Sequence, residues 1–250
     1  MKEKYKTTGL NFSKLYLTTI DFYFRDARGF SQYIEEYIKQ KIDSFDTDHR
    51  LDPEEEEKNH DYYYFKVDEL SEKWWQFSRD FPSEFRASHI SQVYSGIDTH
   101  LARICERHYN TFLPEKTWKE MKSGSEWGKK LKYLVKYARV DKTGLQKDWE
   151  LLDKIRMVRN QIVHHHSKVS PAEKDWKNIR LFVKKNAMMI EFKNDPNAID
   201  KESGKPMYEA HPKHSFRLLV TSPDLAKLLI DTADSFFKKL LPQVSLKKNT

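Results

Sequence analysis

The segment best suited to chemistry runs from Arg159 to His164 and reads Arg-Asn-Gln-Ile-Val-His. A histidine moves protons near neutral pH, as a general base or a general acid. An arginine presents a fork of donors to a phosphate and stabilises the charge that develops in a transition state. Because RNA carries its own nucleophile, the 2′-hydroxyl, these residue types could cleave it without a metal. We expect Asn160 to hold the histidine or a backbone group by a hydrogen bond.

A helix over residues 146–165 is expected to carry this segment. Each residue of an ideal helix turns by about 100°, so Arg156, Asn160 and His164 lie in one row. Arg159 and His164 differ by about 140° and converge only if the helix ends near His164 or a second copy completes the site. The catalytic hypothesis therefore depends on a helix end or on twofold symmetry.

Two apolar strips run along the same predicted helix. The first strip is a core stripe formed by Leu151, Ile155, Val158 and Ile162. The second strip is interleaved with the polar row and is formed by Trp149, Leu152 and Val163. One stripe is enough to dock a helix in its own domain, so the second strip predicts a further contact. We interpret that contact as a homodimer with two arginines and two histidines around one cleft.

Other readings of these residues remain open. Arg and Asn near a helix C-terminus, followed by histidines, could simply favour the helix dipole and a solvated end. The run from His164 to His166 could also suggest a metal site. Adjacent residues diverge on a helix, however, and no second cluster of Cys, His or Asp has ligand spacing. We therefore expect no metal and no cofactor.

The composition indicates a helical protein that could bind nucleic acid. Its 250 residues carry a formal net charge of +7, but many lysines alternate with acidic residues, as on a solvated helix face. A single cysteine, Cys105, excludes an internal disulfide framework and fits a reducing compartment. No apolar run approaches the roughly 20 residues that span a bilayer, and the N-terminus does not resemble a signal peptide. We expect a cytoplasmic protein with no membrane partner.

Hydrophobic spacing and turn residues predict the order of the elements. Helices are expected over 10–42, 61–80, 84–110, 123–137, 146–165, 172–185 and 224–241. We interpret 43–60 as an exposed acidic loop and Phe81-Pro82-Ser83 as a break between helices. Two short strands at 187–192 and 215–221 predict a hairpin with a long polar loop over 194–213.

These elements predict an all-α fold, a helical bundle with long helices and a small β-hairpin near the C-terminus. We expect residues 1–82 to form an N-terminal helical region packed on the bundle. The core is expected over 83–242 and includes the hairpin at 187–221. Residues 243–250 are expected to form a frayed tail.

The string from Ile155 to His164 resembles the signature of the HEPN superfamily. In that signature an arginine, commonly followed by asparagine, precedes a histidine after about four to six residues. The helix around Ile97 to Cys105 is similar to the one that carries an acidic or polar residue in many members. The stretch from Leu131 to His164 is similar to bacterial HEPN proteins of abortive-infection and toxin type, and the resemblance covers residues 84–240.

The resemblance implies a HEPN-type bundle, a dimer with the motifs at its interface, and metal-independent RNA cleavage. It implies that Arg159 and His164 are catalytic, that Asn160 supports them, and that Asp98 is an upstream acidic partner. Asp98 reads equally as an ordinary helix-surface residue. The expected products carry a 2′,3′-cyclic phosphate or 3′-phosphate and a 5′-hydroxyl.

Four further residues around the motif are expected to contact RNA. They are Arg156, His165, His166 and Lys168. Family toxins controlled by a nucleotidyltransferase antitoxin often carry a tyrosine two residues beyond the motif histidine, where this chain has His166. This chain lacks that tyrosine, so we do not expect control by a nucleotidyltransferase antitoxin.

The leading hypothesis is an endoribonuclease of toxin or phage-defence type that acts on tRNA or mRNA. It would have an antitoxin or defence-system protein as a possible partner. The alternative is a non-catalytic HEPN module for dimerisation or for binding a partner, a nucleotide or RNA. A helical adaptor with no nucleic-acid role is the third reading.

Overall fold

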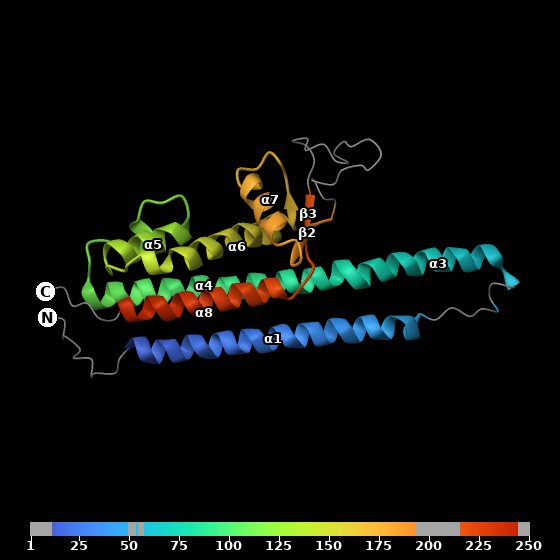
Figure 1. Cartoon of the computed structure of the whole chain (residues 1–250), viewed down its shortest axis with the longest axis horizontal. Helices are drawn as coiled ribbons and strands as arrows, with labels where there is room; N and C mark the ends of the chain where they lie inside the picture. The colour runs from blue at the N-terminus through green and yellow to red at the C-terminus, as the bar shows by residue number, and fades with distance from the viewer. Residues whose placement is uncertain (1–11, 50–53, 55–57, 194–215, 245–250) are drawn as a thin grey trace. The chain divides into compact units, whose positions relative to one another are not determined.

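The computed structural model describes residues 12–49, 54, 58–193 and 216–244 of the chain. The described residues form an all-α fold with a small antiparallel sheet, as predicted (Figure 1). The α-helices are α1 Phe12–Asp48, α3 His60–Trp75, α4 Phe81–Phe112, α5 Glu126–Lys136, α6 Gln146–His164, α7 Trp176–Lys185 and α8 Asp224–Val244. Shorter turns are the π-helix η1 Gln76–Asp80 and the 3₁₀-helices η2 Trp118–Glu120 and η3 Thr143–Leu145. The strands are β1 Lys168–Val169, β2 Ile190–Phe192 and β3 Phe216–Val220.

The first helix extends further than its sequence pattern predicts. α1 continues to Asp48 instead of stopping at 42, so residues 43–48 are helical and the predicted loop over 43–60 is wrong there. Phe45 explains the extension, because it is buried and its ring packs against those of Trp74 and Phe77. Most of residues 50–57 lies outside the described part of the chain.

The predicted break at Phe81-Pro82-Ser83 does not occur. The π-helix η1 follows α3 directly, and α4 begins at Phe81 without a loop. The π-helix immediately before Pro82 changes the hydrogen-bonding register of the backbone there, so the chain continues as a helix past the proline. Ser83, the last residue of the predicted break, lies within α4 and accepts a hydrogen bond from the backbone N–H of Val220 at 2.8 Å.

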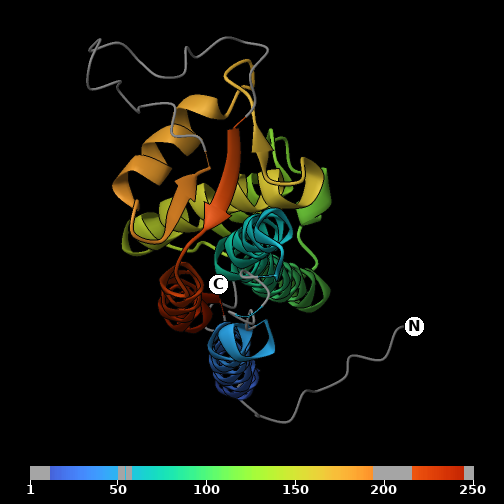
Figure 2. The ribbon, with the colours of Figure 1, turned by 90° about the vertical axis from the view of Figure 1, so that its right-hand side faces the viewer.

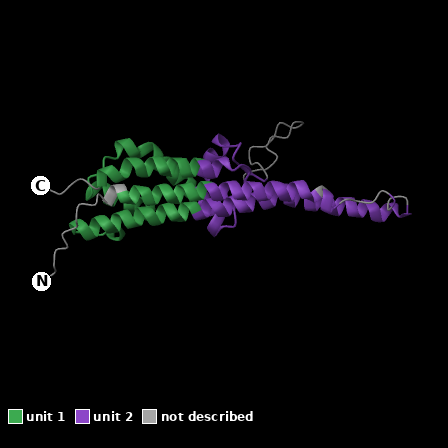
Figure 3. Ribbon diagram, turned by 90° about the horizontal axis from the view of Figure 1, so that it is seen from below, with its two compact units in different colours: residues 1–28, 93–156, 228–250 green, residues 29–92, 157–227 purple. Residues whose placement is uncertain are grey.

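The chain divides into two compact units built from interleaved segments (Figure 3). Unit 1 comprises residues 1–28, 93–156 and 228–250, and unit 2 comprises residues 29–92 and 157–227. The helices α1, α4, α6 and α8 each contribute residues to both units. The predicted division into 1–82, 83–242 and 243–250 stays a prediction. α8 itself continues to Val244, three residues past its predicted end at 241.

Aromatic side chains form the core of unit 1. The rings of Trp127 and Trp149 stack at 4.1 Å between centroids, and both pack against Phe236. On α1, Phe24 is fully buried and packs against Phe237 of α8. This aromatic contribution supports a core in a chain with only 38% hydrophobic residues.

Unit 2 contains the sheet, with strand order β1-β3-β2 and antiparallel pairing throughout. Pairing of β2 with β3 confirms the predicted hairpin, whose loop over 194–213 lies outside the described residues. α7 lies beside the sheet (Figure 2), and its Trp176 packs on Phe192 and Phe216. β1 was not predicted, because two residues are too short to show the alternation that identifies a strand.

Two arginines, Arg86 on α4 and Arg79 on η1, tie helical segments to other elements within unit 2. Arg86 on α4 binds both carboxylate oxygens of Glu35 on α1 and donates to the carbonyl of Thr221 at 2.8 Å. Arg79 pairs with Glu191 of β2. No helix among the described residues is both long and apolar enough to cross a bilayer.

Candidate active site

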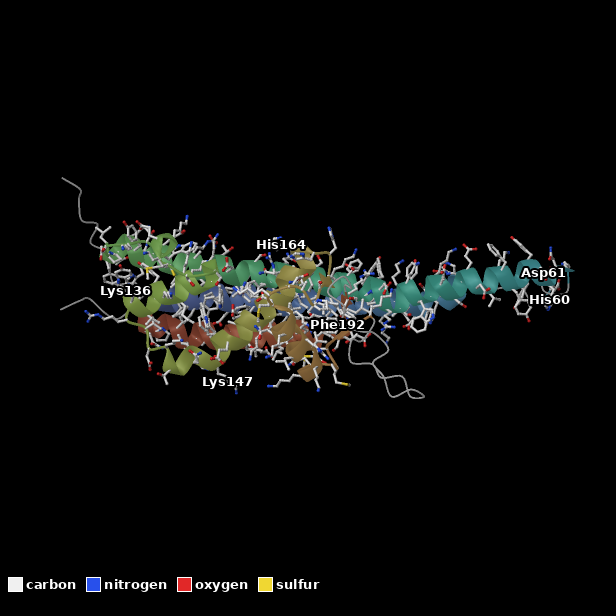
Figure 4. The ribbon with its side chains drawn as sticks, turned by 90° about the horizontal axis from the view of Figure 1, so that it is seen from above. His60, Asp61, Lys136, Lys147, His164 and Phe192 are labelled. Atoms are coloured by element: carbon white, nitrogen blue, oxygen red, sulfur yellow. The ribbon has the colours of Figure 1, made fainter. Side chains whose placement is uncertain are left out.

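The helix that carries the motif ends at the motif histidine. α6 terminates at His164, which meets the first of the two conditions set by helical geometry (Figure 4). Beyond it, His166 and Ser167 take positive φ angles of 50° and 64°. The backbone N–H groups of His165 and Ser167 both donate to the carbonyl of Gln161. The chain thus leaves the helix axis within a few residues and enters β1.

Arg159 and Asn160 contact each other at the start of the motif. Both side chains are half-buried, and Nη1 of Arg159 donates to Oδ1 of Asn160 at 3.3 Å. Asn160 was expected to hold the histidine or a backbone group, and here its side-chain oxygen faces the arginine instead. A hydrogen bond of this kind restricts the rotamers of a long guanidinium side chain, which lowers the entropy lost on binding an anion.

The histidine half of the motif faces solvent. His164, His165 and His166 are all exposed. Within the described part of the chain, no hydrogen bond or ion pair engages the His164 imidazole. The ring nitrogens of His164 are therefore available to a substrate, while the neighbouring arginine is held by its own chain.

Arg156 belongs to the predicted row but already has an acidic partner. Its Nε donates to Oδ1 of Asp153 at 2.8 Å, one turn earlier on α6. Arg156 lies in unit 1, whereas Asn160 and His164 lie in unit 2 on the same helix. Binding of RNA by Arg156 would have to compete with this carboxylate.

The second apolar strip of α6 is largely covered by the chain itself. Trp149 and Leu152 are 7% and 0% exposed, and Trp149 stacks on Trp127 inside unit 1. Val163 alone among the strip residues is exposed, at 41%. The inference that this strip must meet a second molecule is therefore corrected: intramolecular packing accounts for its first two residues, and only Val163 is left for a partner.

Asp98 has a structural role in unit 1. Its Oδ1 accepts a hydrogen bond of 2.7 Å from Nζ of Lys130, which is 1% exposed and also lies over the Trp118 ring. A buried ammonium needs a counter-ion, and Asp98 supplies it. Its catalytic role stays a prediction.

A pocket in unit 2 adjoins the end of α6. Its lining contains two predicted RNA-binding residues, His166 and Lys168, together with residues that the sequence did not single out. The full lining is Glu84, Ile162, His166, Ser167, Lys168 and Arg217. Arg217 was missed because it comes from β3, about fifty residues further along the chain, and no local pattern links it to the motif.

The described residues offer neither an accessible thiol nor a metal-binding cluster. Cys105 is buried, and burial raises the pKa of its thiol, so a thiolate nucleophile is disfavoured there. No group of His, Cys, Asp and Glu side chains in the described ranges is arranged to hold a metal ion.

Comparison with known proteins adds no assignment. No family model, curated protein or solved structure matches this chain. The HEPN resemblance therefore rests on the residues quoted above, and membership of that superfamily stays a prediction.

Proposed function

We propose that this protein is a metal-independent endoribonuclease with its active centre at the C-terminal end of α6. The observation that supports this best is the end of α6 at His164. It leaves an exposed imidazole on the same short segment as an arginine whose guanidinium is held by Asn160. A proton carrier and a phosphate ligand at one accessible helix end are the minimum needed for this reaction.

In the proposed reaction, His164 accepts the proton of the 2′-hydroxyl, and that oxygen attacks the adjacent phosphorus. The bond from phosphorus to the 5′-oxygen breaks, and this oxygen leaves as a hydroxyl after gaining a proton from a histidinium. Arg159 donates to the non-bridging oxygens, where negative charge develops. The products carry a 2′,3′-cyclic phosphate and a 5′-hydroxyl, and the RNA supplies its own nucleophile.

A second copy of the chain completes the site in this proposal and supplies the second histidine. Exposed Val163, one residue before His164, is the apolar position left for such a contact. In the cell the proposed role is that of a cytoplasmic toxin or phage-defence effector of HEPN type. It would act on tRNA or mRNA and be restrained by an antitoxin or defence-system protein.

The test is incubation of purified protein with RNA in EDTA, followed by analysis of the product ends. His164→Ala and Arg159→Ala are each expected to lower the cleavage rate by about 10²–10⁴-fold. His60→Ala is the matched control for an exposed histidine outside the motif, and it should cleave at the wild-type rate. Arg25→Ala, which removes an exposed arginine of α1, is the control for Arg159.

Absence of cleavage by the wild-type protein, or equal cleavage by the His164→Ala variant, would contradict the proposal. If RNA stays intact but Arg159→Ala weakens self-association, the non-catalytic module is the correct reading. Sedimentation of the same samples gives that second measurement.

A further inference from the structure

The pocket beside the end of α6 has a cationic pair built into the sheet. It is open to solvent on one side, has a volume of about 340 Å³ and is lined only by residues of unit 2. Lys168 of β1 is the direct cross-strand partner of Arg217 of β3. Side chains in register on adjacent antiparallel strands lie about 5 Å apart at Cβ, and like charges in this position destabilise the pair. The fold therefore brings together two cations that repel each other.

Acidic residues neutralise only one of these cations. Nη2 of Arg217 lies 2.5 Å from Oε1 of Glu84, and its Nη1 lies 3.8 Å from Oδ2 of Asp80. Asp80 also pairs with Lys193 at 2.8 Å. Lys168 is exposed and has no acidic partner within the described ranges of the chain. One positive charge of the pocket is thus left for an anion.

The pocket lies next to the proposed catalytic segment along the chain. His166, which lines it, follows the proposed catalytic His164 by two residues. Ile162, half-buried on the last turn of α6, supplies an apolar wall, and Ser167 adds a polar one. A cavity of this volume falls at the lower end of the range for small-ligand sites, which suits one nucleotide unit.

We propose that this pocket is a subsite that binds a backbone phosphate of single-stranded RNA next to the cleaved bond. Lys168 and Arg217 hold the phosphate, and Ile162 contacts the attached nucleoside. The subsite rests on the proposed ribonuclease function, which explains why a phosphate chain would lie beside His164. Glu84 competes with the RNA phosphate for Arg217, so this carboxylate limits the affinity of the subsite.

The experiment measures binding of a short single-stranded 2′-O-methyl RNA oligonucleotide, which lacks the nucleophile and cannot be cleaved. Fluorescence anisotropy is recorded over a series of salt concentrations for the wild type and three variants. Lys168→Glu is expected to weaken binding about fivefold and to make the log–log salt slope shallower by about 0.7. Lys184→Glu, the same charge change at an exposed position of α7, should stay within about twofold of wild type.

Glu84→Gln tests the subsite in the opposite direction. Loss of this carboxylate frees Arg217 for the phosphate, so binding of the same oligonucleotide should tighten about threefold or more. Thermal melting of each variant shows that it is folded before binding is compared. Loss of the folded pocket would weaken binding at the subsite, so the expected gain of affinity keeps the test informative if Lys168→Glu proves unstable.

Equal weakening by Lys168→Glu and Lys184→Glu, or no tightening by Glu84→Gln, overturns the subsite. Failure of the proposed function gives a different result, because natural RNA would then stay intact with wild-type protein. If the oligonucleotide still binds in a Lys168-dependent manner in that case, the phosphate subsite is supported and the nuclease is not. Inorganic phosphate in place of the oligonucleotide should show no Lys168-dependent binding at micromolar concentration, and tight binding of it would overturn the assignment to RNA.

Discussion

Nζ of Lys130 donates to Oδ1 of Asp98 at 2.7 Å, joining α5 to α4 inside unit 1. Lys130 is 1% exposed, whereas Asp98 is 39% exposed at its side chain. The lysine is therefore the buried member of the pair, and the carboxylate is its counter-ion. Asp98, the one acidic residue expected in the active site, therefore has a structural role as the counter-ion of Lys130, and this role can be tested.

Asp98→Asn is expected to lower the free energy of unfolding by about 2 kcal/mol, because it leaves a buried ammonium with no counter-ion. The partial exposure of Asp98 keeps the loss below that of a fully buried pair. Asp153→Asn is the matched control: Asp153 is also 39% exposed, but its partner Arg156 is 21% exposed and stays partly solvated. Urea unfolding monitored by circular dichroism measures both.

The Asp98 variant also separates structure from catalysis. If folded Asp98→Asn protein cleaves RNA at the wild-type rate, its role is structural. Loss of cleavage without loss of stability would instead support the predicted catalytic partner. Combining Asp98→Asn with Lys130→Met should cost less stability than the two single changes added together, since no unpaired charge is left.

Trp149→Ala should destabilise unit 1 by about 3–5 kcal/mol, because it removes a buried ring that stacks on Trp127. Val163→Ala, on the same strip of α6 but 41% exposed, should cost about 1 kcal/mol or less. Thermal unfolding of the two variants compares the effects. If the two changes destabilise the protein equally, the interpretation that intramolecular packing covers the Trp149 end of the strip is wrong.

His166→Gly is expected to stabilise the folded chain by about 0.5–1 kcal/mol. His166 has a φ of 50°, a left-handed conformation that glycine adopts without a steric penalty. Arg139→Gly, at a φ of 52°, should give a similar gain and serves as the control. If His166 contacts RNA, its variant will gain stability while RNA binding weakens, and Arg139→Gly will change stability alone. A loss of stability in both would refute the backbone argument.

Stability should fall as the pH drops below about 6.5. Burial lowers the pKa of His108, and burial together with Arg103 lowers the pKa of His100, from the ordinary value of 6.5. Below 6.5 the unfolded chain therefore binds protons more readily than the folded chain. The stability that these two neutral histidines contribute to the free energy of unfolding is fully present above pH 6.5. It is lost as the pH falls towards their folded-state pKa values.

Urea unfolding at several pH values, with His108→Gln as the variant, checks this expectation. His108 shares a hydrogen bond of 3.0 Å with the hydroxyl of Tyr133, and glutamine keeps a polar group at that position. The variant should show a shallower decline in unfolding free energy between about pH 7.5 and 5.5 than wild type. Exposed His60→Gln should decline as wild type does, and identical slopes for all three proteins would count against the buried histidines.

Helix positions followed from the sequence where apolar spacing and caps agreed. The α6 prediction of 146–165 differs from Gln146–His164 by one residue. At the start of α8, Ser222 accepts a hydrogen bond from the N–H of Asp224 at 3.1 Å. Both results depend on groups a few residues apart, so local spacing was sufficient.

The predictions of helix limits and contacts were wrong where the structure depends on more than the local spacing of apolar residues. Proline at 82 indicated a break, but a π-helix before it lets the chain continue as a helix. The end of α1 was placed too early because the burial of Phe45 depends on Trp74, which no local pattern reveals. The second apolar strip of α6 suggested a partner molecule, and Trp127 instead stacks on Trp149 of that strip.

The sequence by itself determined the helical class, the hairpin and the residues Arg159, Asn160 and His164 as the candidate centre. Periodicity, caps and side-chain chemistry are local properties, because each depends on residues that lie near one another in the sequence. Only the tertiary structure decided that Asp98 serves Lys130 and that Lys168 lies opposite Arg217. Such pairs depend on strand register and on burial between elements far apart in the chain, where cooperative packing outweighs local preference.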